Sequence, residues 1–333
     1  MLSLLITQVL ALPVETPPVE YYEFSHEQKV HGEQLGGLSG LSYQSGDCYA
    51  AVSDARNNPL IHRFCFGDNE LTWQTPIVLS HASGESMSDL SLDGEGLERA
   101  PDGWWLSAEL TTENPDQFLF HINPQGSATD SFRLPPELSH YQFVANGTFE
   151  GLTALPDGTL LTALEKPPLN QSADQRLLTP LFSIHTDSGE VALRGYYPLD
   201  EVMPNVDRGL VALSVLPFFP EVEPGLTLDQ DETEVLEAKS SPRYLLAVER
   251  HYEPGVGNRI VFFVFDLPNE SDELAVVSKH RWFELAELGI DCDNIEGVVF
   301  DSYGRLVLVS DNNFSSHQRT QIIRLDFRAL FQR

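Results

Sequence analysis

Residues 150–165 have the sequence EGLTALPDGTLLTALE, in which two short apolar runs flank a Pro-Asp-Gly turn. Glycine readily takes the positive φ that tight turns require, so this stretch predicts a β-hairpin. Related stretches recur about every 55 residues and begin at Gly40, Glu95, Glu296 and, as a copy that is split by an insertion, Arg208. The chain therefore repeats one hairpin unit, which indicates a repeat architecture.

Two further strand-like runs follow each hairpin, for example residues 181–185 and 191–197. Four strands in each repeat are typical of a β-propeller blade. We therefore expect an all-β, single-domain propeller over residues 21–333, with five four-stranded blades. Six blades are the alternative, if one repeat has diverged beyond recognition. The last repeat lacks a fourth strand, and residues 21–30 are expected to supply it, which closes the ring between the two chain ends.

The split repeat contains an acidic insertion at about residues 217–242, with seven acidic residues and one lysine. A segment of this composition is expected to project as a loop. It is either a lid over a site or a solvated insertion without a function of its own.

The 333 residues include 50 acidic and 20 basic ones, and the formal net charge is −30. Nucleic-acid binding depends on basic side chains that neutralise phosphates, so we expect no nucleic-acid partner. The same balance excludes a polybasic membrane-surface protein. The 41% hydrophobic content is sufficient for a packed core.

The N-terminal apolar run, residues 1–12, is shorter than the ~20 residues that a membrane span needs. Its length suits a signal-peptide core, although a basic n-region and a clear cleavage site are missing. We expect residues 1–20 to be a signal segment with a Pro/Glu-rich tether, and the protein to be secreted or periplasmic and monomeric. No other run is long and apolar enough to be transmembrane. Cys48 and Cys65 lie in neighbouring strand-like runs and either form a disulfide or remain thiols, as Cys292 does.

Each hairpin begins and ends with an acidic residue, as Glu150 and Glu165 show. Residues that are equally distant from a hairpin turn face one another, and the corresponding ends of all blades meet at one mouth of a propeller. We therefore expect a ring of carboxylates that holds metal, formed by Asp54, Glu95, Glu109, Glu150, Glu165, Glu249, Glu296 and Asp311. Any single member can equally serve only to accept backbone N–H groups.

Two carboxylates about 5 Å apart repel by roughly 3 kcal/mol at an effective dielectric constant near 20, so the ring needs a cation. Ca²⁺ takes six to eight oxygen ligands and fits best. Basic residues, including Arg56, also follow the strand ends. Four of them are candidate catalytic residues that bind phosphate or transfer protons: Lys166, Arg250, His251 and Arg319. A metal with such groups suits a small anionic substrate such as a phosphate ester.

The ordered motifs resemble the phytase-like domain family, described as "esterase-like activity of phytase". They include GGLSGLSY at 36–43, DGEGL at 93–97, NGTFEGL at 146–152 and, most specifically, VSDNNF at 309–314. The resemblance implies a secreted or periplasmic β-propeller that hydrolyses phosphate esters with calcium. The fourth repeat departs from the pattern, because Val211 stands where the pattern expects Glu.

Three functions are compatible with these observations. The first is an exported, calcium-dependent phosphoric ester hydrolase. The second is a non-enzymatic propeller that is stabilised by calcium and binds a ligand or protein partner. The third is a lactonase-like or carboxylic ester hydrolase. The sequence contains no Gly-x-Ser-x-Gly elbow, HExxH motif or P-loop.

Overall fold

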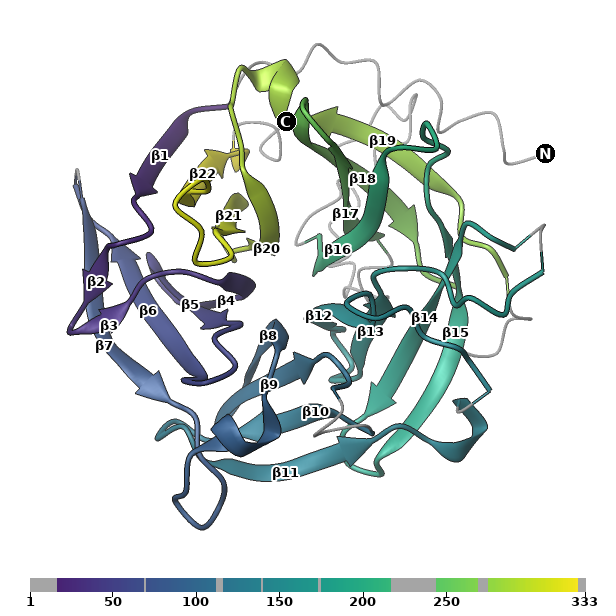
Figure 1. Ribbon diagram of the computed structural model, residues 1–333, viewed down its shortest axis with the longest axis horizontal. Helices are drawn as coiled ribbons and strands as arrows, with labels where there is room; N and C mark the ends of the chain where they lie inside the picture. Colours follow the sequence, from purple (N-terminus) through teal and green to yellow (C-terminus); the bar gives the residue numbers. More distant parts are fainter. Residues whose placement is uncertain are drawn as a thin grey trace, which may run out of the picture.

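The computed structural model describes residues 17–68, 70–111, 116–138, 140–172, 175–216, 244–268 and 275–328. The strands of these residues form five antiparallel sheets of four strands, arranged as blades around a central axis (Figure 1). The protein is thus a five-bladed β-propeller, as the repeat predicted, and the six-bladed alternative is excluded.

Blades one to four each follow the chain from the innermost strand outward. Blade one contains β4 (Leu38–Ser45), β5 (Cys48–Ser53), β6 (Leu60–Phe66) and β7 (Leu71–Val78). Blade two contains β8 (Gly94–Ala100), β9 (Gly103–Ala108), β10 (Gln117–Ile122) and β11 (Ala128–Arg133). Blade three contains β12 (Phe149–Ala154), β13 (Leu160–Leu164), β14 (Leu178–His185) and β15 (Glu190–Pro198). Blade four contains β16 (Asp207–Val215), β17 (Tyr244–Glu253), β18 (Gly257–Asp266) and β19 (Lys279–Glu284).

Blade five combines the two ends of the chain. Its inner strands are β20 (Asn294–Phe300), β21 (Arg305–Asp311) and β22 (Thr320–Asp326), and its outer strand is β1 (Val19–Phe24). β1 pairs with β22 in antiparallel register, as Figure 1 shows at the edge of this blade. The N-terminal run therefore closes the ring as predicted, but the strand ends at Phe24 because a turn follows it, in which Gln28 N donates to Ser25 O.

Short elements complete the described fold. They are the ribbon of β2 (Lys29–Val30) and β3 (Glu33–Gln34) and the 3₁₀ helices η2 (Met87–Leu90), η3 (Pro136–Leu138) and η4 (Leu285–Leu288). No helix among the described residues is long and apolar enough to span a membrane. A disulfide joins Cys48 to Cys65 across β5 and β6, whereas Cys292 is a free cysteine.

Apolar side chains fill the spaces between neighbouring blades. The buried side chains form five clusters, and each cluster combines residues of two adjacent blades. Between blades four and five, for example, the Phe283 and Phe327 rings lie 5.6 Å apart. Because every blade shares its core with both neighbours, the described ring forms one structural unit.

The innermost hairpins contain a β-bulge near the mouth. In blade three, Glu150 pairs with Ala163 and Leu152 pairs with Thr162, so that one extra residue is accommodated between them. As a result Glu165 lies opposite Thr148, to whose carbonyl its N–H donates, and not opposite Glu150. The expectation that the two glutamates face one another directly is therefore wrong, because the bulge shifts the register, although both stay at the same end of the hairpin.

In every blade except blade four, a glycine at the bulge allows the inner strands of adjacent blades to approach closely. A Cβ on Gly40 would lie 2.5 Å from Leu97 N, and one on Gly151 would lie 2.6 Å from Leu213 N. These are backbone atoms of the next blade, so a side chain at either position would push the strands apart. This contact explains why the repeat carries glycine after its acidic residue.

The acidic insertion, residues 217–242, lies outside the described residues, as do residues 1–16 of the expected signal segment. Both assignments stay predictions. Leu216 N donates to Tyr244 O where the described parts of β16 and β17 end. This is the end of the hairpin away from Gly209 and Arg250, which pair at the mouth.

Candidate functional site

A cavity of about 1200 Å³ opens at the end of the ring where the innermost strands begin. Its lining includes many acidic side chains, contributed by all five blades: Asp54, Asp93, Glu95, Glu109, Glu150, Glu165, Asp207, Asp291, Asp293, Glu296 and Asp311. Seven of the eight carboxylates expected from the hairpin pattern are among them. The eighth, Glu249, is not part of this lining.

The bulged register explains why Glu249 is the exception. In blades one, two, three and five, the second strand of the inner hairpin ends at the mouth with Asp54, Glu109, Glu165 and Asp311. In blade four the equivalent position, opposite Gly209, is occupied by Arg250. Because side chains alternate along a strand, Glu249 faces away from the mouth. The repeat alignment that equated Glu249 with the ring carboxylates was displaced by one residue.

Glu249 has its own buried network behind the mouth. Its carboxylate accepts a hydrogen bond from the Tyr197 hydroxyl at 3.0 Å and one from Asp200 N at 3.0 Å, and it pairs with Lys279. His251 Nε2 lies 3.0 Å from the same carboxylate. Burial alone would raise the pKa of Glu249, but hydrogen bonds from His251 and Lys279 hold it below its usual value. Glu249 and His251 thus stabilise blade four together, and the structure does not place either in the mouth.

Arg250 extends into the ring in their place. Its guanidinium donates to Glu165 Oε1 at 3.1 Å and also binds Glu296 and Asn294. Only 17% of its side chain is exposed. The carboxylates outweigh the effect of burial, so the pKa of Arg250 is raised and the group stays charged. Blade four therefore supplies a fixed positive charge where the other blades supply negative ones.

The remaining ring carboxylates are poorly compensated. Burial, followed by repulsion from neighbouring carboxylates, raises the pKa of Glu95, Glu150 and Asp311 well above the ordinary values. The pKa of Asp54 is raised to about 7 by burial and by Asp93. Burial also raises the pKa of Glu165 to about 7, although Arg250 and Lys166 oppose it. At neutral pH these groups must either share protons or bind a cation.

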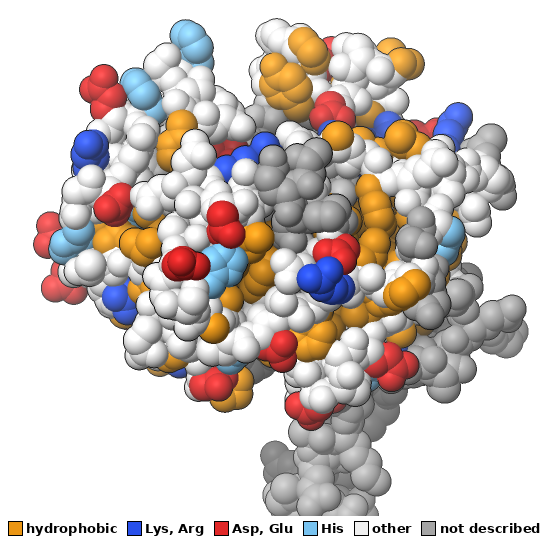
Figure 2. Space-filling model, turned by 60° about the horizontal axis from the view of Figure 1, so that its bottom comes forward, with side chains coloured by type: hydrophobic (Ala, Val, Ile, Leu, Met, Phe, Trp, Pro, Cys, Tyr) orange, Lys and Arg blue, Asp and Glu red, His pale blue; other side chains and the backbone are white. Residues whose placement is uncertain are grey.

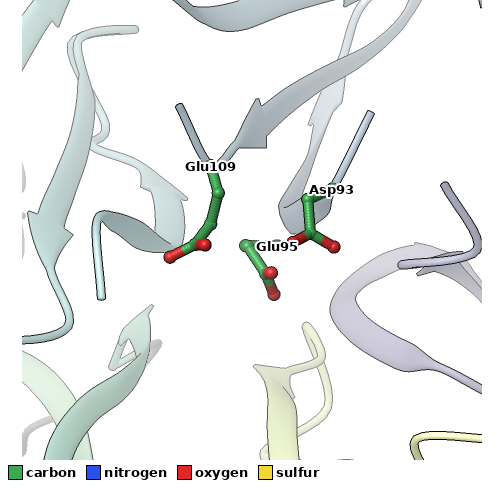
Figure 3. A group of neighbouring side chains, drawn as sticks. All are labelled: Asp93, Glu95 and Glu109. Atoms are coloured by element: carbon green, nitrogen blue, oxygen red, sulfur yellow. The ribbon is translucent and has the colours of Figure 1, made fainter. Parts of the chain in front are cut away.

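Asp93, Glu95 and Glu109 form the tightest carboxylate group at the mouth. One oxygen from each lies within 4.8 Å of the others, and Figure 3 shows them gathered where β8 begins and β9 ends. Asp93 was missing from the predicted set, although it stands two residues before Glu95 and such residues share one face of a strand. That spacing was the signal that could have identified it.

The donor set fits a hard divalent cation. All three groups offer oxygen, the ligand type that Ca²⁺ and Mg²⁺ prefer. Two further buried oxygens of the same cavity, Glu150 Oε2 and Asp54 Oδ1, have no hydrogen-bond partner among the described residues. A buried carboxylate oxygen without a partner is costly unless a proton or a cation satisfies it.

Of the other predicted cations, Arg56 and Arg319 line the mouth, whereas Lys166 lines a neighbouring cavity. Lys166 Nζ binds Asp207 at 2.9 Å and lies 3.9 Å from Glu165. Arg319 lines the mouth and is bound to Glu23 and Asp291, both at 3.2 Å. Arg56, which the sequence suggested only as a neutralising group, pairs with Asp93 while 48% of its side chain is exposed. Among these residues Arg56 is therefore the cation that best combines contact with the carboxylate group and access to solvent.

Comparisons with solved structures find distant similarities. A hypothetical protein from Leishmania major is 12% identical with a TM-score of 0.43, covering 88% of this chain and 85% of that one. An aldose sugar dehydrogenase from Streptomyces coelicolor is 11% identical with a TM-score of 0.43, covering 93% and 100%. A xylan beta-1,4-xylosidase from Bacillus halodurans is 10% identical with a TM-score of 0.47, covering 87% and 53%.

No curated protein matches the sequence. A family model does, over residues 33–314, which include most of the described ring and all of the ring carboxylates. The model is that of the phytase-like family, described as esterase-like activity of phytase. The chain belongs to this family.

Proposed function

We propose that the mouth is a calcium site and the active site of a phosphoric ester hydrolase. The observation that carries the proposal is the group of Asp93, Glu95 and Glu109 in the same cavity as Glu150 Oε2, which has no hydrogen-bond partner among the described residues, in a chain of the phytase-like family. A ring of this kind has little structural purpose without a cation, since carboxylates at matched strand ends contribute nothing to core packing.

In this proposal Asp93, Glu95, Glu109 and Glu150 hold the cation. When bound, it supplies Lewis-acid stabilisation of the negative charge on a phosphate ester and its transition state. Arg56 binds the anionic group of the substrate, because its guanidinium is at the edge of the carboxylate group and half exposed.

Two further groups have supporting roles. Arg250 holds Glu165 and Glu296 in fixed positions and is not itself free for the substrate. Asp54 Oδ1 has no partner among the described residues, and with a pKa of about 7 it is able to exchange a proton with water at neutral pH. For Lys166 and Arg319 the phosphate-binding role stays a prediction.

The test is phosphate release from phytate and simple phosphomonoesters, with calcium and with a chelator. We expect release with calcium only, and a loss of at least about tenfold in Glu109→Gln, because a direct ligand counts for more than an outer-shell partner. Glu190→Gln, at an exposed position of β15, is the control and should match the wild type. Absence of phosphate release with every metal tried would overturn the proposal. If calcium then still raised Tm, the non-enzymatic, calcium-stabilised propeller would be the better account.

We also propose export, to the periplasm or outside the cell. The Cys48–Cys65 disulfide supports it, because structural disulfides persist mainly in oxidising compartments. Fractionation of expressing cells tests it: mature protein in the periplasm or medium is expected, and full-length protein retained with the cytosol would contradict it.

A further inference from the structure

A second cavity, of about 700 Å³, lies beside the mouth. It is formed by the segment after β13 and by the segment between β15 and β16, and Asp207 lines both cavities. We call it the side pocket. Its volume is in the range of small-molecule sites, 300–1,000 Å³.

The side pocket combines apolar residues with polar and charged ones. Ten of its sixteen lining residues are apolar: Val144, Pro167, Pro168, Leu169, Leu177, Leu199, Val202, Met203, Pro204 and Val206. The side chains of Leu169 and Met203 are 69% and 68% exposed, so part of the apolar surface of the pocket is in contact with solvent. Large exposed apolar side chains around one hollow are typical of a ligand site, and methionine adapts readily to different ligand shapes.

The charges of the side pocket leave one cation unpaired. Lys166 binds Asp207 at 2.9 Å, and Arg176 binds Glu201 at 2.9 Å. Arg208, the second residue of β16, also lines the pocket but has no ion-pair or hydrogen-bond partner among the described residues. In a chain with 50 acidic and 20 basic residues, a partly buried arginine without an acidic partner is unusual. The five charged side chains of the pocket are those of Lys166, Arg176, Arg208, Glu201 and Asp207, and their net charge is +1.

We propose that the side pocket binds a small amphipathic anion. The apolar body of the ligand lies against the prolines, Leu169 and Met203, and its carboxylate or phosphate pairs with Arg208. Burial of the apolar body supplies the affinity, and the guanidinium selects a charged head group over a neutral one. This site needs no metal, since its own arginine balances the anion, whereas the mouth repels anions until a cation is bound.

Calorimetric titration with octanoate and with octyl phosphate, in the presence of a chelator, tests the proposal separately from catalysis. We expect one ligand to bind per chain and octanol to bind at least about tenfold more weakly, which is the effect of one charge-assisted contact. Arg208→Gln should lose the same factor for the anions and leave octanol binding unchanged. Met203→Asp should weaken all three ligands.

Arg176→Gln is the matched control. This arginine lines the same pocket, but its charge is already paired with Glu201, so its loss should change anion affinity less than threefold. Because Met203 is exposed and Arg208 is only partly buried, both variants are expected to keep the wild-type Tm. If neither anion binds, or if Arg208→Gln binds them as tightly as the wild type does, the proposal is wrong.

Discussion

Arg250 is the residue that most distinguishes one blade from the others. It occupies the position that Asp54, Glu109, Glu165 and Asp311 hold in the remaining blades, and it binds Glu165 and Glu296. The ring of side chains at the mouth is therefore not uniformly acidic. Arg250 neutralises one part from within, whereas the group of Asp93, Glu95 and Glu109 is the part for which we propose a cation.

Arg250→Gln should destabilise the calcium-free protein by about 3 kcal/mol, because it leaves two buried carboxylates without their partner. Denaturant unfolding in the presence of a chelator measures this. Arg259→Gln removes an ion pair whose arginine is 56% exposed, and should cost less than about 1 kcal/mol. Equal stabilities for Arg250→Gln and the wild type would show that Arg250 does not compensate the ring.

The burial of His62 should make the stability of the folded protein sensitive to acid, independently of the ring carboxylates. It is fully buried in blade one beside the Trp73 ring, and burial lowers its pKa from 6.5 to about 4. In the unfolded chain the imidazole takes up a proton below about pH 6.5, whereas the folded protein resists protonation until about pH 4. Its contribution to stability is therefore complete above pH 6.5 and is lost as the pH falls toward 4, by about 3 kcal/mol in total.

His62→Phe should remove this component. The measurement is the free energy of unfolding from pH 7 to pH 4 for both proteins, and the difference between the two curves is the contribution of His62. Parallel curves would contradict the assignment.

At this scale the sequence predicted most of the site and missed specific members. Seven ring carboxylates followed from hairpin symmetry alone. Glu249 was misplaced, because a one-residue bulge changes which residue faces the mouth and leaves almost no mark in the spacing of the repeat. Asp93 was missed although its position two residues before Glu95 was visible in the sequence. The pairing of Cys48 with Cys65 was left open, since two strand-like runs do not reveal their register.

Within the inner hairpins of blades two, three and five, an acidic residue and the glycine after it act together, whereas blade one has Ser39 before its Gly40. The bulge directs the carboxylate to the mouth, and the glycine beside it lets the next inner strand approach. Blade four again differs, because Val211 and Ala212 occupy the two positions. The same blade thus lacks the acid, the glycine and the terminal carboxylate.

Gly151→Ala should cost about 2–3 kcal/mol, because its Cβ would meet backbone atoms of Ala212 and Leu213 that have no room to move. The reciprocal change, Ala212→Gly, is the matched control on the facing strand and should cost about 1 kcal/mol or less. Chemical denaturation of the two variants tests this. Similar losses in both would show that close contact between the inner strands is not what the glycine provides.

The blade count and the closing strand were predictable because each repeat carries its own hairpin signal, a Gly-containing turn between two apolar runs. The ends of the strands were harder to predict from the sequence. Residues 21–30 were expected as one strand, but β1 starts at Val19 and ends at Phe24, where a turn of polar residues begins.

At the scale of the whole molecule, the charge of −30 is distributed unequally. On the face shown in Figure 2, acidic side chains are scattered among uncharged ones, with basic groups nearby. At the mouth they are concentrated and buried, where burial and mutual repulsion raise the pKa values. Because the raised pKa values belong to the folded ring, we expect the stability of the protein to depend on pH.

Without calcium, the protein should become more stable as the pH falls from 8 to about 6.5. The folded-state pKa values of Asp54 and Glu165 are about 7, against ordinary values of 3.8 and 4.5. The folded ring therefore takes up protons near pH 7 while the unfolded chain stays ionised until about pH 4. Thermal unfolding at pH 8 and pH 6.5 in the presence of a chelator measures this, and saturating calcium should reduce the difference. A stability that falls over this range would contradict the assignment of raised pKa values.

If the carboxylates of the mouth form one cation site, calcium titration of the chelator-stripped protein will detect it. Calorimetry at pH 6.5 in two buffers with different ionisation enthalpies reports both binding and the protons that binding releases. We expect calcium to bind and to displace protons from the ring, because burial and neighbouring carboxylates raise the pKa values of the proposed ligands Glu95 and Glu150 well above the ordinary range. Glu95→Gln should weaken the binding at least about tenfold. Calcium binding without proton release, or the absence of binding, would contradict the account.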